Sequence, residues 1–176
     1  PSNAEEYIAM LDWALDQDKH PVYIAIPSGP VVHAEGSVRT NFDVLNTYEV
    51  TREGSKVAVL ALGDFYDLGE KTVEALSSTL GIEATLVKPY FVSGVDQDLL
   101  DNLVKDHDVI VTIEDGIIEG GWGQNIASYL GTSPARVLNY GVKKAFYDRV
   151  NIADLMRESH LEPELIAADV KQVLGL

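Results

Sequence analysis

Apolar residues along the chain fall into short blocks of two kinds that alternate with each other. Blocks of the first kind are continuous and rich in Val, Ile and Leu, as in residues 56–62 (KVAVLAL), which is typical of a strand buried on both faces. Blocks of the second kind repeat every three or four residues, which is typical of an amphipathic helix. The expected strands are residues 48–51, 56–62, 83–88, 108–113 and 135–139, and the expected helices are residues 67–80, 96–105, 121–130, 152–159 and 163–174.

The alternation of strands and helices after residue 46 predicts the class of fold. Parallel strands need crossover connections, and the helices in those connections cover both faces of the sheet. A hairpin-like turn is expected at residues 52–55, between the first two strands, because this segment contains Gly54. The sequence therefore predicts a three-layer α/β/α domain with a mixed, mostly parallel sheet of about five strands. In such a sheet ligands bind beyond the carboxyl ends of the strands.

The front of the chain follows a different pattern. Residues 5–17 carry apolar side chains at helical spacing, and residues 21–26 predict a short apolar strand that the turn-rich residues 27–30 bring to an end. Residues 31–46 are polar and show little periodicity, which is typical of a linker. We therefore expect three parts: a piece of a preceding domain at residues 1–30, a linker at residues 31–46 and the main domain at residues 47–176.

The first residues leave the origin of the chain open. The chain begins with Pro1 and has no initiator Met or signal peptide, so we expect a piece excised or processed from a longer protein. Ser2-Asn3-Ala4 is compatible with a cloning remnant and also with a native helix start.

Composition and charge exclude several classes of function. The 176 residues include no cysteine, which excludes disulfides, cysteine-bound zinc, iron–sulfur clusters and thiol nucleophiles, and which fits a reducing cytoplasm. The formal net charge of -15 repels phosphate backbones and anionic lipid headgroups, so we expect no nucleic acid as a partner. No apolar run approaches the roughly 20 residues of a membrane span, so we expect a soluble protein with no membrane contact.

A strand followed by two carboxylates and a glycine-rich helix start is the richest segment of the chain. Glu114 and Asp115 follow the strand at residues 108–113, and Gly120 and Gly121 open the next helix. A helix start with free amides can bind an anion, so these residues form a candidate ligand or interface cluster, together with Gly63 and Asp64. In the alternative interpretation the glycines allow close helix–sheet packing, and the carboxylates cap helices or pair locally. The segment matches neither a nucleotide-binding P-loop nor a dinucleotide fingerprint.

Other polar residues indicate no catalytic set and no metal site. Asp96, Asp98 and Asp101 would point in different directions from one helix, so Asp96 is expected to cap that helix and not to bind a cation. The histidines show no zinc-like spacing and no neighbouring serine–acid pair, so surface or capping roles are expected. They are His20, His33, His107 and His160.

Several of these segments together resemble one known domain. They are residues 56–63 (KVAVLALG), 111–115 (VTIED), 120–123 (GGWG) and 137–141 (VLNYG). They resemble the C-terminal domain shared by transketolase, the β subunits of 2-oxo-acid dehydrogenases and 1-deoxy-D-xylulose 5-phosphate synthase, and the synthase version is the most similar. The resemblance covers nearly the whole chain from Lys56 onward. The front end resembles the end of the pyrimidine-binding domain of the same family.

The resemblance implies a role inside a larger enzyme. The parent is expected to transfer a two-carbon unit from a keto donor to an aldehyde phosphate with thiamine diphosphate and Mg²⁺, which in the synthase is a step of isoprenoid precursor biosynthesis. The family's cofactor and metal sites lie in earlier domains, so no cofactor-binding, metal-binding or catalytic residue is expected in this chain. The domain is expected to support the fold and the homodimer of the parent, with the rest of that enzyme or a complementary subunit as partner, and to be inactive alone.

Two positions depart from the family pattern. The synthase strand that resembles residues 21–29 ends in Arg-x-Pro-Arg-Gly, where arginine helps to hold the substrate phosphate, and this chain has Ala25 and Ser28 there. Neither side chain can donate a fork of hydrogen bonds, so this phosphate anchor is expected to be lost. Two further interpretations stay open. One is a sensing or interaction domain that binds a small polar metabolite near Gly63, Glu114 and the Gly120-Gly121 turn, and the other is a subunit of a split enzyme.

Overall fold

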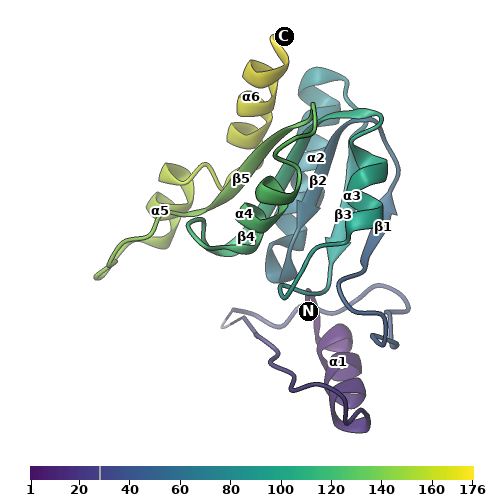
Figure 1. The fold of residues 1–176 in the computed structure, drawn as a ribbon. Helices are drawn as coiled ribbons and strands as arrows, with labels where there is room; N and C mark the ends of the chain where they lie inside the picture. Colours follow the sequence, from purple (N-terminus) through teal and green to yellow (C-terminus); the bar gives the residue numbers. More distant parts are fainter. Residues whose placement is uncertain (28) are drawn as a thin grey trace. The chain divides into compact units, whose positions relative to one another are not determined.

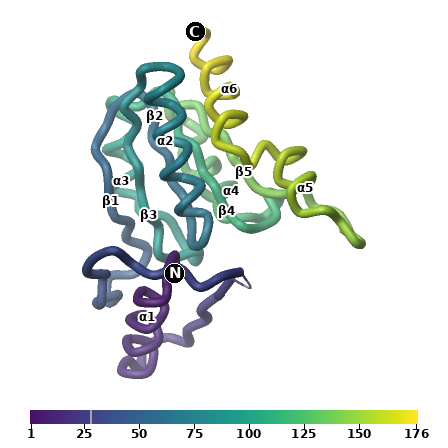
Figure 2. Tube along the Cα trace, turned by 180° about the vertical axis from the view of Figure 1, so that it is seen from behind, coloured from purple at the N-terminus to yellow at the C-terminus, as the bar shows by residue number. Residues whose placement is uncertain are grey.

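The computed structural model describes residues 1–27 and 29–176, which form two compact units, Pro1–Leu45 and Asn46–Leu176. All strands of the described residues belong to the larger unit (Figures 1 and 2). Each unit has its own buried residues.

The larger unit is built around one five-stranded sheet. The described strands are β1 (Tyr48–Arg52), β2 (Lys56–Ala61), β3 (Thr85–Pro89), β4 (His107–Ile117) and β5 (Arg136–Val142), in the spatial order β1-β3-β2-β4-β5. The pairs β3–β2, β2–β4 and β4–β5 are parallel, and β1 pairs with β3 in the antiparallel direction. The prediction of a mixed, mostly parallel sheet of about five strands is confirmed.

Helices cover both faces of this sheet (Figures 1 and 2). One core contains residues of α2 (Tyr66–Leu80) and α6 (Pro163–Leu174), and the other contains residues of α3 (Gln97–Leu103) and α4 (Trp122–Tyr129). Successive residues of β2 enter the two cores in turn, Val57 and Val59 the first and Ala58 and Leu60 the second. A strand with a core on each side has no polar face, which explains its continuous apolar sequence.

The predicted hairpin at residues 52–55 is wrong. β1 does not pair with β2, because β3 lies between them in the sheet. The chain instead crosses the end of β3, where Ser55 N donates to Glu83 O (2.9 Å) and Gly54 N donates to Thr85 Oγ1 (3.0 Å). A Cβ atom on Gly54 would lie 2.2 Å from Glu83 O, so this close crossing requires glycine.

The smaller unit contains α1 (Ala4–Asp16), close to the predicted residues 5–17. Asn3 Oδ1 accepts from Glu6 N (2.8 Å) and caps the helix start. The buried Glu6 carboxylate accepts in turn from Ser2 N (2.8 Å) and Ser2 Oγ (3.0 Å). Ser2 and Asn3 therefore stabilise the start of the helix.

The strand predicted over residues 21–26 is not formed. No ladder of hydrogen bonds joins this segment to another strand among the residues that the structure describes. A strand is stable only with a neighbouring strand, and Pro21 has no amide hydrogen to donate. Most of these side chains are exposed, and Tyr23 is 89% exposed.

The helices of both units are short. The longest helix in the described ranges, α2, has 15 residues, and α5 (Ile152–Glu158) has 7. Across residues 1–27 and 29–176, no helix combines the length and the apolar character that crossing a bilayer demands.

Candidate functional site

Glu114 reaches from β4 to the start of α4. Its Oε2 atom accepts from Trp122 N (2.8 Å), its Oε1 atom accepts from Gly123 N (2.9 Å), and the residue is only 6% exposed. The N-cap residue of α4, Gly121, makes no side-chain cap. A carboxylate from the strand therefore satisfies the first amides of the helix, where the helix dipole favours negative charge. This geometry is the capping role of the alternative interpretation.

Glycines make room for this carboxylate. A Cβ atom on Gly121 would lie 2.6 Å from Glu114 Oε1, and one on Gly123 would lie 2.4 Å from Thr112 Oγ1. One on Gly141, in β5, would lie 2.9 Å from Gly116 O. The glycine-rich start of α4 thus serves the close packing of helix, strand and carboxylate.

Burial raises the pKa of Glu114, while the amide hydrogen bonds from Gly123 and Trp122 act in the opposite direction. Because both carboxylate oxygens are already bonded to the helix start, an external anion would have to displace this side chain. The prediction of a ligand near Glu114, Gly120 and Gly121 stays a prediction. The structure shows that the first amides of α4 are occupied by the chain itself.

Asp64 and Asp115 lie where two adjacent parallel strands reach the same edge of the sheet. Asp64 follows β2 in a short 3₁₀ turn, Gly63–Phe65, and Leu62 N donates to Ile113 O of β4 (2.9 Å). Desolvation raises the pKa of Asp64, and the negative charge of Asp115 raises it further. β4 continues to Ile117, past its predicted end at residue 113, so Asp115 lies inside the strand.

Two predicted site glycines shape turns. Gly63 has a φ of 61° and Gly120 a φ of 84°, a backbone region that side chains with a Cβ atom avoid. Gly120 N donates to Gln124 Oε1 (2.6 Å), which joins the turn to the first turn of α4. The positive φ angles therefore explain why both positions are glycine.

A metal site does not arise from these carboxylates. Within the described ranges no three His, Asp or Glu side chains gather in a way that could hold a metal ion. Asp96 Oδ1 accepts from Leu99 N (3.0 Å) and its Oδ2 accepts from Tyr48 N (2.8 Å). The prediction that Asp96 caps α3 is confirmed, and the same carboxylate also holds the start of β1.

A surface or capping role was expected for His107, and the residue is buried and contacts the carbonyl of the last residue of α3, Leu103. The residue is 6% exposed, with Nε2 lying 2.7 Å from Thr85 Oγ1 and Nδ1 lying 2.8 Å from Leu103 O. Nδ1 also lies 2.7 Å from the Asp106 carboxylate. A histidine can be buried when both ring nitrogens have partners, and here it joins β4 to β3 and to the end of α3. The predicted strand began at residue 108, whereas β4 begins at His107, so the sequence pattern did not place this histidine inside the sheet.

A second polar cluster was missed from the sequence. Asp169 Oδ2, on α6, accepts from Tyr140 OH (3.0 Å) and lies 2.7 Å from His160 Nδ1. Burial and the Asp169 charge raise the pKa of Tyr140. The three residues are far apart in sequence and share no motif, so only the fold could reveal them. They fix the turn before α6 to the sheet.

The two positions that depart from the family pattern lie in the smaller unit. Ala25 is exposed in the extended segment that follows α1, and Ser28 lies outside the described residues. The lost phosphate anchor therefore stays a prediction.

Comparison with known proteins places these features in a family. Residues 46–166 match the family described as "Transketolase, C-terminal domain". The 1-deoxy-D-xylulose-5-phosphate synthase of Pseudoalteromonas translucida is 36% identical over 179 residues, and that of Chlorobium luteolum is 32% identical over 176 residues. The alignments cover 99% and 98% of this chain and 27% of each synthase, so the chain spans about a quarter of the length of these relatives.

A solved structure is also similar over the full length of the chain. It is described as "Split gene transketolase, inactive beta4 tetramer", and it aligns with a TM-score of 0.74 and 25% identity. The alignment covers 100% of this chain and 57% of the other.

Proposed function

The chain belongs to the transketolase C-terminal domain family, and from this premise we propose that it is a non-catalytic part of a thiamine-diphosphate-dependent enzyme that resembles 1-deoxy-D-xylulose-5-phosphate synthase. The parent transfers a two-carbon unit from a keto donor to an aldehyde phosphate, as a cytoplasmic homodimer. This domain stabilises the fold and the subunit contacts of that enzyme.

The occupied start of α4 is the observation that carries this proposal. In α/β domains, phosphates bind at helix starts beyond the carboxyl ends of the strands. Here Glu114 fills that position, and Asp64 and Asp115 add negative charge to the same edge. The diphosphate of thiamine diphosphate would meet the negative charge of these carboxylates, and the helix amides that could bind it are occupied by Glu114. Among the described residues no group of three acidic or histidine side chains could hold its metal ion, so the residues present do not fit the cofactor. The cofactor then has to be held by other domains.

The front of the chain supports a domain boundary near residue 46. The family match begins at residue 46, whereas the synthases align with 99% and 98% of the chain, including its front. Residues 1–30 are then the last helix and an extended segment of the pyrimidine-binding domain, residues 31–46 the linker, and residues 47–176 the C-terminal domain. With Ala25 and Ser28 in place of arginines, the parent holds the substrate phosphate by a different anchor.

A split enzyme is the second candidate, and one observation favours it. The split-gene transketolase chain covers this chain from end to end, front unit included. In that case the partner is a separate subunit that carries the cofactor domain, and the chain alone is inactive, as the description of that relative says of its tetramer.

Turnover tests both candidates. The isolated chain is incubated with a keto acid, an aldehyde phosphate, thiamine diphosphate and Mg²⁺, and no product is expected. Product formed by the isolated chain would overturn the non-catalytic role. Adding a chain that carries the cofactor domain should produce turnover if the enzyme is split.

A thermal-shift panel separates these candidates from a metabolite sensor. A ligand present at about a hundred times its dissociation constant stabilises a protein by about 2.7 kcal/mol. We expect a flat panel for polar metabolites, inorganic phosphate and thiamine diphosphate. A clear shift that disappears in Asp64→Asn and Asp115→Asn variants would favour the sensor instead.

A further inference from the structure

The chain between β5 and α5 keeps apolar side chains in solvent, unlike the strands of the larger unit. In residues 143–152, here called the Phe146 arm, Phe146 is fully exposed at 108% and Ile152 is 69% exposed. Tyr147 and Val150 are partly exposed, at 43% and 38%. In Figures 1 and 2 this segment extends away from the sheet. Aromatic side chains exposed in this way are typical anchors of protein–protein contacts.

Hydrogen bonds hold the arm at both of its ends. At the first end Glu119 Oε2 accepts from Lys144 N (2.8 Å), and Tyr147 OH donates to Lys143 O (2.8 Å). At the second end Asn151 Oδ1 accepts from amides of the first turn of α5 and caps that helix. A loop that is fastened in this way loses little conformational entropy when it binds, so Phe146 is presented as a pre-organised anchor.

The arm leaves the sheet at the edge where ligands and active sites of α/β domains lie. β5 is parallel to β4, and β4 is parallel to β2. The arm follows Val142 at the end of β5, so it begins at the same edge of the sheet as Asp64 and Asp115. Ile118 N, in the turn after β4, donates to Val142 O (2.9 Å). The arm can therefore reach a protein surface that faces this edge.

The arm is basic, although the whole chain has a formal net charge of -15. Three basic side chains, Lys143, Lys144 and Arg149, stand against the carboxylates of Asp148 and Glu119. A basic loop with an aromatic tip fits an acidic surface that contains an apolar pocket.

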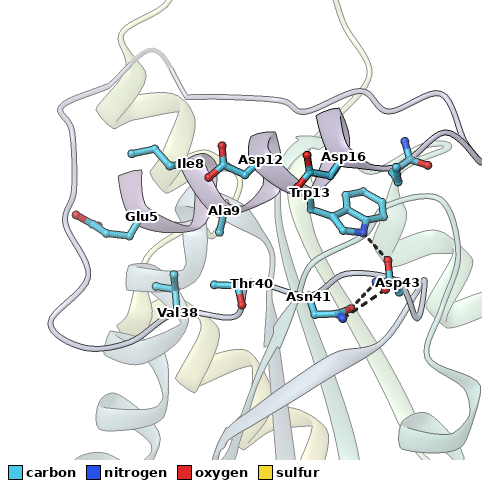
Figure 3. A pocket seen from close by; sticks show the side chains of 11 residues that line it. Glu5, Ile8, Ala9, Asp12, Trp13, Asp16, Val38, Thr40, Asn41 and Asp43 are labelled. Carbon is cyan, nitrogen blue, oxygen red and sulfur yellow. Dashed lines mark hydrogen bonds between the residues drawn. The ribbon is translucent and has the colours of Figure 1, made fainter.

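Two surfaces are candidates to receive the arm. One is a groove along α1, where Ile8, Ala9 and Trp13 lie beside the acidic Asp12 and Asp16 (Figure 3). This groove belongs to the unit that we assign to the pyrimidine-binding domain, so the rest of that domain is its expected cover. The other is the cofactor-bearing part of the parent enzyme, since this chain spans only 27% of the length of its synthase relatives.

We propose that the Phe146 arm docks on the cofactor-bearing part of the parent enzyme, in the same polypeptide or in a separate subunit. Phe146 enters an apolar pocket of that part, and acidic side chains around the pocket pair with Lys143, Lys144 and Arg149. This docking presupposes the proposed function, and it makes the arm the element that holds the two parts of the enzyme together.

Photocrosslinking from the arm tests the docking. Phe146→p-benzoylphenylalanine is produced in the cells that make the chain, the complex is irradiated, and mass spectrometry identifies the linked peptide. We expect a peptide from a thiamine-diphosphate-binding part of the enzyme, with Asp or Glu near the linked residue. A peptide from the α1 groove of a second copy, a peptide from an unrelated protein, or no linked peptide would each overturn the proposal. Leu176→p-benzoylphenylalanine is the control, because Leu176 is 66% exposed and lies outside the arm.

The affinity of the complex gives a second readout. Phe146→Ala should weaken the binding of a separate cofactor-bearing subunit on the order of thirtyfold, as expected for an aromatic anchor, and Lys143→Glu/Lys144→Glu should weaken it as well. In a single polypeptide Phe146→Ala should instead make the linker at residues 31–46 more accessible to protease. Leu176→Ala should change neither readout, and the isolated Phe146→Ala chain should melt like the wild type because the side chain is exposed.

The docking and the proposed function fail in different ways. A Phe146→Ala variant that binds as tightly as the wild type, and that leaves the linker equally protected, would overturn the docking and leave the proposed function intact. Product formed by the isolated chain would overturn the proposed function.

Discussion

In the larger unit the strands place their apolar side chains between two layers of helices, whereas in the smaller unit α1 leaves Leu15 76% exposed. The larger unit also satisfies its polar groups internally, and across the described residues every buried side-chain nitrogen or oxygen has a partner. The smaller unit keeps an extended segment at residues 21–26 without a strand partner. The larger unit therefore buries most of its apolar side chains within itself. The smaller unit leaves apolar side chains exposed that another protein surface can cover.

The largest expected effect concerns a backbone crossing that exists only in the larger unit. Gly54→Ala places a Cβ atom 2.2 Å from Glu83 O and 2.4 Å from the Ala84 carbonyl carbon, and neither backbone atom can move freely. We expect a loss of about 3 kcal/mol in the free energy of unfolding, measured by urea denaturation. Gly36→Ala, in the smaller unit, has open space around its Cβ and should change stability by less than about 0.5 kcal/mol. Equal effects of the two substitutions would remove the contrast between the units.

The second effect concerns the cap of α4. Glu114→Ala leaves the amides of Trp122 and Gly123 without their partner and should cost about 2–3 kcal/mol in urea denaturation. Glu114→Gln keeps one acceptor oxygen and should cost about half as much. Glu74→Ala, at an exposed position of α2, is the control and should be near neutral. A neutral Glu114→Ala variant would mean that water caps the helix equally well.

Acid should affect Glu5 in the smaller unit and the pair Glu114 and Asp64 in the larger unit in opposite directions. The Ala34 amide and the His33 side chain hold the pKa of Glu5 down at about 2, so this carboxylate stabilises the smaller unit above pH 4.5 and loses its effect as the pH falls toward 2. In the larger unit the pKa values of Glu114 and Asp64 are raised, so their protonation on acidification favours the folded state. Carboxyl NMR titration should show Glu5 titrating well below Glu114. Asp115→Asn should lower the pKa of Asp64, and an unchanged value would show that the two charges do not interact.

The smallest expected effect is at the exposed face of α1. Leu15→Ser should change the free energy of unfolding of the isolated chain by less than about 0.5 kcal/mol, because the side chain is already in solvent. The same substitution should weaken co-purification with a cofactor-domain chain if this face meets the parent enzyme.

The sequence predicted the elements well and their neighbours less well. Strands with continuous apolar runs, such as residues 56–62, could be recognised because burial on both faces leaves a clear pattern. The partner of β1 could not be recognised, because strand pairing depends on contacts between residues that are distant in sequence. A glycine between two strands indicates a turn, but it does not show whether the second strand pairs with the first. The carboxylates and glycines of the candidate site were found by their pattern. The sequence left two interpretations of these residues open, a ligand cluster or capping and packing, and the distances around Glu114 show the capping and packing contacts.

The position of β1 has a consequence for the order in which the sheet can assemble. β1 is synthesised first, yet its hydrogen-bond partner β3 emerges only after β2 and α2. During synthesis β1 therefore stays unpaired until the crossover through α2 has brought β3 alongside β2. Once docked, β1 covers the outer edge of β3 and becomes the edge strand in its place, so the edge that the nascent chain exposes changes only when β1 docks. A ribosome-bound chain that ends after α2 should therefore leave the segment of β1 accessible to protease.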